Sequence, residues 1–105
     1  MNVEILYFEG CPHWRDAGDR VRAAAELAGL SAVEIGYRRI ATAAEAESLP
    51  FAGSPTILID GTDAFAGAAP VEAFACRVYP TASGLAGSPT IDQLVEVLRD
   101  RCARP

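Results

Sequence analysis

The chain contains no lysine, and its positive side-chain charge comes from arginine alone. Its 9 basic residues are outnumbered by 14 acidic residues, which gives a formal net charge of −5. Arg38-Arg39 is the only adjacent basic pair in the sequence. Because proteins that bind nucleic acids use basic patches to neutralise phosphates, this composition argues against a nucleic-acid partner.

Long hydrophobic runs are also absent, and a bilayer span requires about 20 such residues. The first residues lack the basic region, the apolar stretch and the small-residue cleavage site of a secretory signal. We therefore expect a cytoplasmic protein without a membrane partner. A chain of 105 residues has the size of one domain with a modest core, so we expect a single domain over residues 1–105.

Cysteine is sparse and odd in number, with Cys11, Cys76 and Cys102 as its positions. In the cytoplasm this favours free or redox-active thiols over a framework of structural disulfides. Cys11, His13 and Cys76 could together bind a soft metal ion, but their spacing is not that of a zinc site. We expect no resident metal ion and no cofactor.

Hydrophobic periodicity predicts alternating strands and helices. The expected strands cover residues 2–8, 32–40, 55–60 and 75–79, and the expected helices cover 12–28, 42–49 and a last segment that begins after Thr90. Capping boxes at Thr42–Glu45 and Thr90–Gln93 indicate two of the helix starts, and Asp60-Gly61 indicates a turn. The order β-α-β-α-β-β-α predicts an α/β fold with a central mixed four-stranded sheet and helices on both faces.

Cys11 is the strongest candidate for chemistry, since it follows the first strand and Gly10. Pro12 suits the first position of a helix because the amide hydrogen that it lacks would be unpaired there. Cys11 would then be the N-cap, where free backbone amides and the helix dipole favour an anion. We expect such a thiol to ionise readily and to act as a nucleophile. The alternative is that Cys11 is a small buried hydrophobic residue.

Two places in the sequence resemble the thioredoxin-like superfamily. Cys11-Pro12 stands at the first strand-to-helix junction, and Ser54-Pro55-Thr56 stands at the start of the third expected strand. In that superfamily a cis-proline at this position lies against the active-site cysteine, and the backbone beside it pairs with the extended chain of the substrate. The resemblance therefore implies a thioredoxin-like fold over nearly the whole chain and a cis Ser54–Pro55 bond.

The chain departs from the Cys-x-x-Cys pattern of thioredoxins at its fourth position, because it reads Cys11-Pro12-His13-Trp14. The longer pattern YF-x-GCP-x-W … GSPT-I-L-x-DG … CRVY … GLAGSPT is similar to small bacterial thioredoxin-family proteins that are sometimes labelled alkylmercury-lyase-like. The usual resolving thiol is missing. Resolution of a mixed disulfide at Cys11 would therefore require an external thiol or Cys76.

The predicted site has Cys11 as its catalytic nucleophile and Cys76 as a candidate resolving thiol. The residues expected to contact a substrate are Pro12, His13, Trp14, Ser54, Pro55 and Thr56. Trp14 could equally be a core residue at the start of the helix, and His13 could be a solvated surface imidazole. The expected partners are proteins or low-molecular-weight thiols and disulfides, and a homodimer is compatible with the sequence.

Two other functions fit the missing second cysteine. A degenerate thioredoxin fold could serve as a binding or dimerisation module, for which a reactive Cys11 is unnecessary. A protein that handles soft metals or organomercurials would instead bind a thiophilic ion at Cys11, with a stoichiometry that depends on Cys76. The reactivity of the Cys11 thiol distinguishes the binding module from the thiol-exchange protein.

Overall fold

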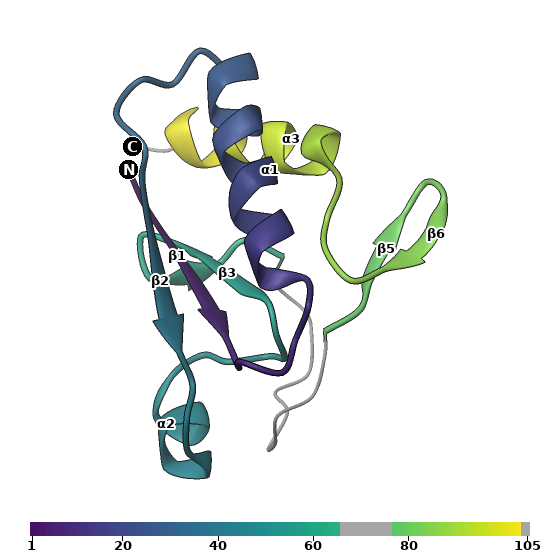
Figure 1. Ribbon diagram of the computed structural model, residues 1–105. Coiled ribbons are helices and arrows are strands. Elements are labelled where there is room, and N and C mark those ends of the chain that lie inside the picture. Colours follow the sequence, from purple (N-terminus) through teal and green to yellow (C-terminus); the bar gives the residue numbers. More distant parts are fainter. Residues whose placement is uncertain (66–76, 104–105) are drawn as a thin grey trace.

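The computed structural model describes residues 1–65 and 77–103 (Figure 1). Its elements are β1 (Asn2–Tyr7), α1 (Trp14–Leu27), β2 (Glu34–Arg39), α2 (Ala43–Ser48), β3 (Thr56–Ile59), β4 (Thr62–Asp63), β5 (Tyr79–Thr81), β6 (Gly84–Ala86) and α3 (Ile91–Ala103). Within these residues, no helix combines the length and the apolar character that crossing a bilayer requires.

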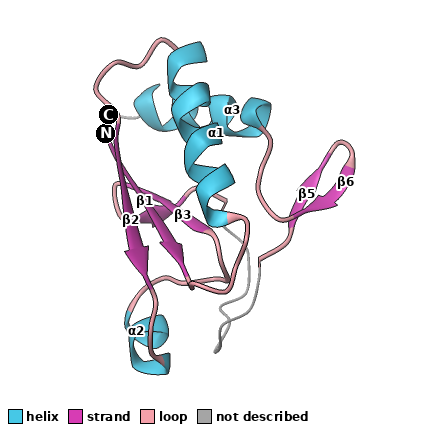
Figure 2. Ribbon diagram, in the orientation of Figure 1, coloured by secondary structure: helices cyan, strands magenta, loops and turns pink. Residues whose placement is uncertain are grey.

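The main sheet has four strands in the order β2-β1-β3-β4. β1 is parallel to β2 and antiparallel to β3, and β3 is antiparallel to β4. The predicted α/β fold with a mixed four-stranded sheet is thus confirmed (Figure 2). Since β1 has a hydrogen-bonded neighbour on each side, its apolar character on both faces matches its central place in the sheet.

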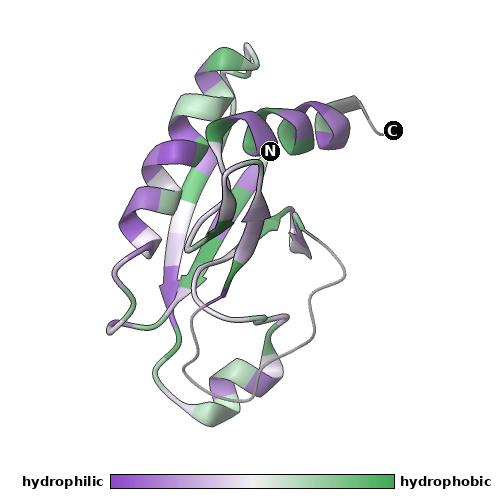
Figure 3. Ribbon diagram, turned by 90° about the vertical axis from the view of Figure 1, so that its right-hand side faces the viewer, coloured by the Kyte–Doolittle hydropathy of each residue, from purple (hydrophilic) through white to green (hydrophobic). Residues whose placement is uncertain are grey.

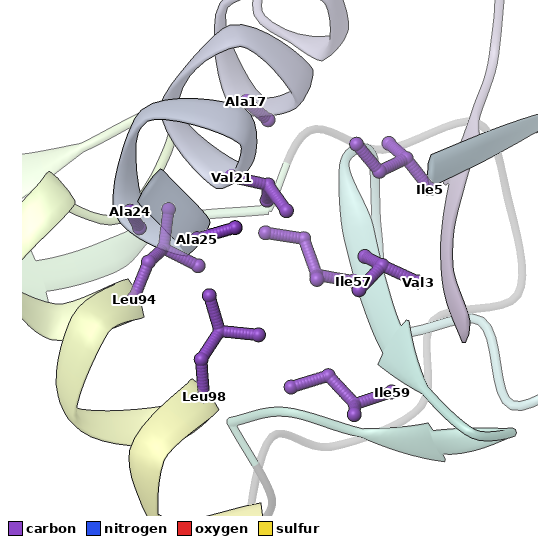
Figure 4. Close-up of a cluster of buried hydrophobic side chains, with 10 residues drawn as sticks. All are labelled: Val3, Ile5, Ala17, Val21, Ala24, Ala25, Ile57, Ile59, Leu94 and Leu98. Carbon is purple, nitrogen blue, oxygen red and sulfur yellow. The ribbon is translucent and has the colours of Figure 1, made fainter. Parts of the chain in front are cut away.

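Helices cover both faces of this sheet, as predicted. Val3 and Ile5 of β1 belong to the larger core, where they pack with residues of α1 and α3 (Figure 4). Leu6 points to the opposite face and belongs to a smaller cluster with Phe51 and with Ala46 of α2. This alternation follows from the two-residue period of a strand. In Figure 3, α1 likewise alternates between hydrophilic and hydrophobic segments, as expected for a helix with one buried face.

Local hydrogen bonds confirm the predicted starts of α2 and α3. Thr42 Oγ1 accepts a bond of 3.2 Å from the Glu45 amide at the start of α2. At α3, Thr90 Oγ1 accepts from the Gln93 amide at 3.1 Å, and the Gln93 side chain accepts from the Thr90 amide at 2.9 Å, which completes a capping box. Gly29 follows α1 with φ of 74°, the left-handed conformation of a glycine that ends a helix.

The predicted fourth strand at 75–79 is wrong. The fourth strand of the sheet is β4, which follows β3 after the turn at Asp60-Gly61. Both turn residues have positive φ, 49° and 85°, as a tight hairpin requires. The chain therefore pairs with the β3 edge long before it reaches residue 75. Residues 75 and 76 lie outside the described residues, and β5, which begins at Tyr79, pairs with β6 in a separate two-stranded sheet.

Candidate functional site

Cys11 lies in a turn that leaves the end of β1. Its amide donates a 3.1 Å hydrogen bond to the Phe8 carbonyl, which closes the turn around Glu9 and Gly10. Glu9 is itself exposed and forms a 3.0 Å ion pair with Arg39. The Cys11 turn is therefore fixed to the end of the central strand by its own backbone.

α1 begins later than the sequence predicts. Its N-cap is His13, whose carbonyl accepts a 3.0 Å hydrogen bond from the Ala17 amide. The predictions that Cys11 is the N-cap and that Pro12 is the first helical residue are therefore wrong. Pro12 and His13 form a further turn between the Cys11 turn and Trp14. The thiol thus precedes the N-cap by two residues. The expected stabilisation of a Cys11 thiolate by the helix dipole therefore does not follow from this structure.

The loop before β3 meets the Cys11 turn. The Ser54–Pro55 peptide bond is cis, as the resemblance implied. Cys11 Sγ donates to the Ser54 carbonyl at 3.4 Å, and Ser54 Oγ accepts from the Phe8 amide at 3.2 Å. Because β1 and β3 are antiparallel, the end of β1 lies beside the start of β3. The structure therefore brings together two parts of the predicted site that are 43 residues apart.

The thiol and the cis-proline loop are both buried. Cys11 is 2 % exposed, and Ser54, Pro55 and Thr56 are fully buried. The Thr56 hydroxyl donates to the Gly53 carbonyl and accepts from the Ala52 amide, so it holds the loop together internally. Among the predicted substrate contacts, Pro12 and His13 are exposed and Trp14 is half-buried.

Trp14 packs against the core from the first turn of α1. Its ring stacks on Tyr7 with a centroid distance of 4.0 Å and meets the edge of Tyr37 at 5.6 Å. These contacts support the interpretation of Trp14 as a packing residue. His13 lies against Gly87, where an added Cβ would be 2.3 Å from the imidazole ring.

Sequence reasoning placed Arg77–Tyr79 in the expected strand at 75–79 and gave it no role at the site, whereas the structure places it over the cis-proline loop. The Arg77 amide donates to the Ser54 carbonyl at 2.9 Å, and the Tyr79 hydroxyl donates to the Pro55 carbonyl at 2.5 Å. Gly53 allows this close approach, since a Cβ at that position would lie 2.9 to 3.0 Å from atoms of Arg77. The segment therefore binds the carbonyls on both sides of the cis bond.

The Arg77 side chain anchors this segment to the main sheet. This side chain is 5 % exposed, and its guanidinium forms a 2.8 Å ion pair with Asp63 of β4, whose side chain is 18 % exposed. It also donates to the Phe65 carbonyl at 2.7 Å and lies 4.7 Å from the centre of the Tyr79 ring. A buried cation needs such partners to offset its loss of hydration. The anchor could not be found from sequence periodicity, because it depends on the hairpin that brings Asp63 into place.

Burial raises the pKa of Tyr79 well above its ordinary value of 10.0, with a smaller opposing contribution from Arg77 and a further increase from Asp63. In the unfolded chain the Tyr79 hydroxyl loses its proton near pH 10, whereas in the folded chain it keeps the proton at that pH. The free energy of unfolding should therefore fall as the pH rises above about 10. Tyr79→Phe should reduce this slope in urea unfolding measured between about pH 9 and 11. An equal slope in the variant would exclude Tyr79 as its source.

The other two cysteines do not join Cys11 in the described part of the site. Cys76 lies outside the described residues, and its roles as a resolving thiol or as a metal ligand stay predictions. Cys102 is exposed on α3 and lines a pocket with Met1 and Leu30, at the end of the sheet where β1 begins. Across residues 1–65 and 77–103, no three His, Cys, Asp or Glu side chains are placed to hold a metal ion.

Comparisons of this chain with protein-family models, with curated proteins and with solved structures each found no match. Function must therefore be inferred from the residues around Cys11.

Proposed function

We propose that this protein is a thioredoxin-like thiol-disulfide exchange protein that acts through a single thiol, Cys11. One observation carries the proposal: Cys11 Sγ lies 3.4 Å from the carbonyl of Ser54, the residue that precedes the cis-proline Pro55. The strand order β2-β1-β3-β4 supports it as well, since it sets a thiol after β1 against a cis-proline before β3.

The exchange conserves thiols and disulfides. The thiolate of Cys11 attacks one sulfur of a disulfide, which forms a mixed disulfide and releases the second sulfur as a thiolate that takes a proton from water. An external thiol, as its thiolate, then attacks the substrate sulfur of the mixed disulfide, forms a new disulfide with it and releases Cys11 as a thiolate. The cytoplasm supplies such thiols.

The surroundings of Cys11 favour an external resolving thiol over an internal one in the same helix turn. Trp14 stands where a Cys-x-x-Cys motif has its second cysteine, and its ring is held between Tyr7 and Tyr37. Pro12 and His13 directly follow Cys11 and are exposed, so an incoming disulfide would meet them.

The test is capture of a small disulfide by the reduced protein. We expect oxidised glutathione to form a mixed disulfide at Cys11, identified by peptide mass spectrometry. Cys11→Ser should abolish the capture at this turn and reduce the glutathione-dependent reduction of bis(2-hydroxyethyl) disulfide to the uncatalysed rate. Cys102→Ser is the matched control and should leave that rate unchanged. Undiminished turnover in the Cys11→Ser variant would refute the proposal.

Cys76→Ser decides how the mixed disulfide is resolved. If the variant keeps the turnover of the unmodified protein, an external thiol resolves the intermediate, as proposed. If turnover is lost while capture at Cys11 remains, Cys76 is the resolving thiol and the single-thiol part of the proposal is wrong.

A second function, a binding module with a degenerate thioredoxin-like fold, is favoured by the burial of the Cys11 side chain. It predicts no capture of glutathione at Cys11 in the folded protein. It also predicts that partner binding is the same in the Cys11→Ser variant, because the sulfur then serves only to fill space.

A further inference from the structure

We infer that the segment Arg77–Tyr79 is a built-in cover of the Cys11 site, which must leave the Ser54–Pro55 loop before a disulfide substrate reaches the thiol. This inference rests on the proposed function and adds a form of regulation to it. The cover consists of described residues that bind the loop through their backbone and side chains.

The hydrogen-bond acceptors of the loop are already used. A carbonyl oxygen has two lone pairs, and that of Ser54 accepts from both the Cys11 thiol and the Arg77 amide. The Pro55 carbonyl accepts from Tyr79, and a proline nitrogen has no hydrogen to donate. An extended substrate that pairs with this backbone would therefore compete with Arg77 and Tyr79 for the same atoms.

The cover is held mainly by the side chains at its two ends. Arg77 is fixed by Asp63 and by the Phe65 carbonyl, and Tyr79 is fixed by the Pro55 carbonyl. Val78, between them, is 55 % exposed and faces solvent. The middle of the segment thus lies at the protein surface, and the departure of the segment would free the Ser54 and Pro55 carbonyls.

The anchors can be weakened without changing the shape of the buried side chains. Asp63→Asn removes the negative charge that faces Arg77, and Tyr79→Phe removes the hydroxyl that binds Pro55. A hydrogen bond between charged groups contributes enough to change an opening equilibrium about tenfold, and a neutral one enough to change it about fivefold. We therefore expect iodoacetamide to alkylate Cys11 about tenfold faster in Asp63→Asn and about fivefold faster in Tyr79→Phe.

The experiment is site-resolved alkylation of the full-length reduced protein, followed by peptide mass spectrometry. Cys102 serves as an internal reference, since it is exposed and lines a pocket with Met1 and Leu30, which are not part of the cover. Glu4→Gln is a matched control for Asp63→Asn, because it removes the acid of an exposed ion pair with Arg38. We expect neither the Cys102 rate nor the Cys11 rate of the Glu4→Gln variant to change.

The proposed cover would be overturned if Cys11 were alkylated at an unchanged rate in both Asp63→Asn and Tyr79→Phe while both variants kept a native circular dichroism spectrum. A parallel rise at Cys102 would also overturn it, because general loosening would then explain the effect. The two proposals fail separately. A Cys11 that is alkylated faster in the variants but never captures glutathione supports the cover and refutes disulfide exchange. If the unmodified protein exchanges glutathione as fast as the Asp63→Asn and Tyr79→Phe variants do, the result supports disulfide exchange and refutes the cover.

Discussion

Leu98→Ala should lower the free energy of unfolding by about 2–5 kcal/mol. Leu98 is 1 % exposed on α3 and packs in the core with Ile57 and Ile59 of β3 (Figure 4). The loss combines the transfer free energy of the removed methyl groups with the cost of the cavity that remains. This core joins α1 and α3 to the sheet, so Leu98 stabilises the fold that holds the Cys11 turn.

Leu27→Ala is the matched control, since it makes the same chemical change on another helix. Leu27 is 64 % exposed near the end of α1, and its removal should change the free energy of unfolding by no more than about 0.5 kcal/mol. Urea unfolding followed by circular dichroism measures both values. Similar losses in the two variants would show that α3 is not packed as described.

Gly53→Ala should destabilise the protein more than Gly84→Ala, by about 1–3 kcal/mol. Both glycines have a backbone that disfavours other residues, with φ of 106° and 110°, and this strain costs each variant about 1–3 kcal/mol. They differ in their surroundings. A Cβ at Gly53 would lie 2.9 to 3.0 Å from Arg77 atoms, two of which are backbone atoms, whereas none of the residues that the structure describes comes within 4 Å of a Cβ at Gly84.

The comparison isolates the contact between the cis-proline loop and the cover. Urea unfolding gives the difference in stability, and alkylation of Cys11 gives its effect on the site. We expect Gly53→Ala to speed alkylation because the added methyl group displaces Arg77, while Gly84→Ala leaves the rate unchanged. Equal losses of stability in the two variants would mean that Gly53 is needed for its backbone conformation alone.

The sequence predicted the features that depend on neighbouring residues. The capping boxes at Thr42 and Thr90 depend on hydrogen bonds within a few residues, and both formed as expected. The turn at Asp60-Gly61 is equally local, and it joins β3 to β4.

The site was predictable only in part. Cys11 and Pro55 were paired through a resemblance, and the structure brings them together. The N-cap assignment failed because proline is favoured at the first helical position but does not define it, and here an additional turn through His13 comes first. The sequence did not predict the burial of Arg77, since a charged side chain is expected at the surface. Its burial depends on Asp63, 14 residues earlier, and therefore on tertiary structure.

The two halves of the site belong to parts of the fold with unequal local stability. The Cys11 turn is attached to β1, which is hydrogen-bonded on both sides within the main sheet. The cover leads into β5, which pairs with β6 alone. Proteins open in small cooperative units whose free energies range from near zero to that of global unfolding. Under the proposed exchange function, a local opening of the cover would therefore govern the rate at which Cys11 meets a disulfide, and a change that stabilises only the core would leave that rate as it is.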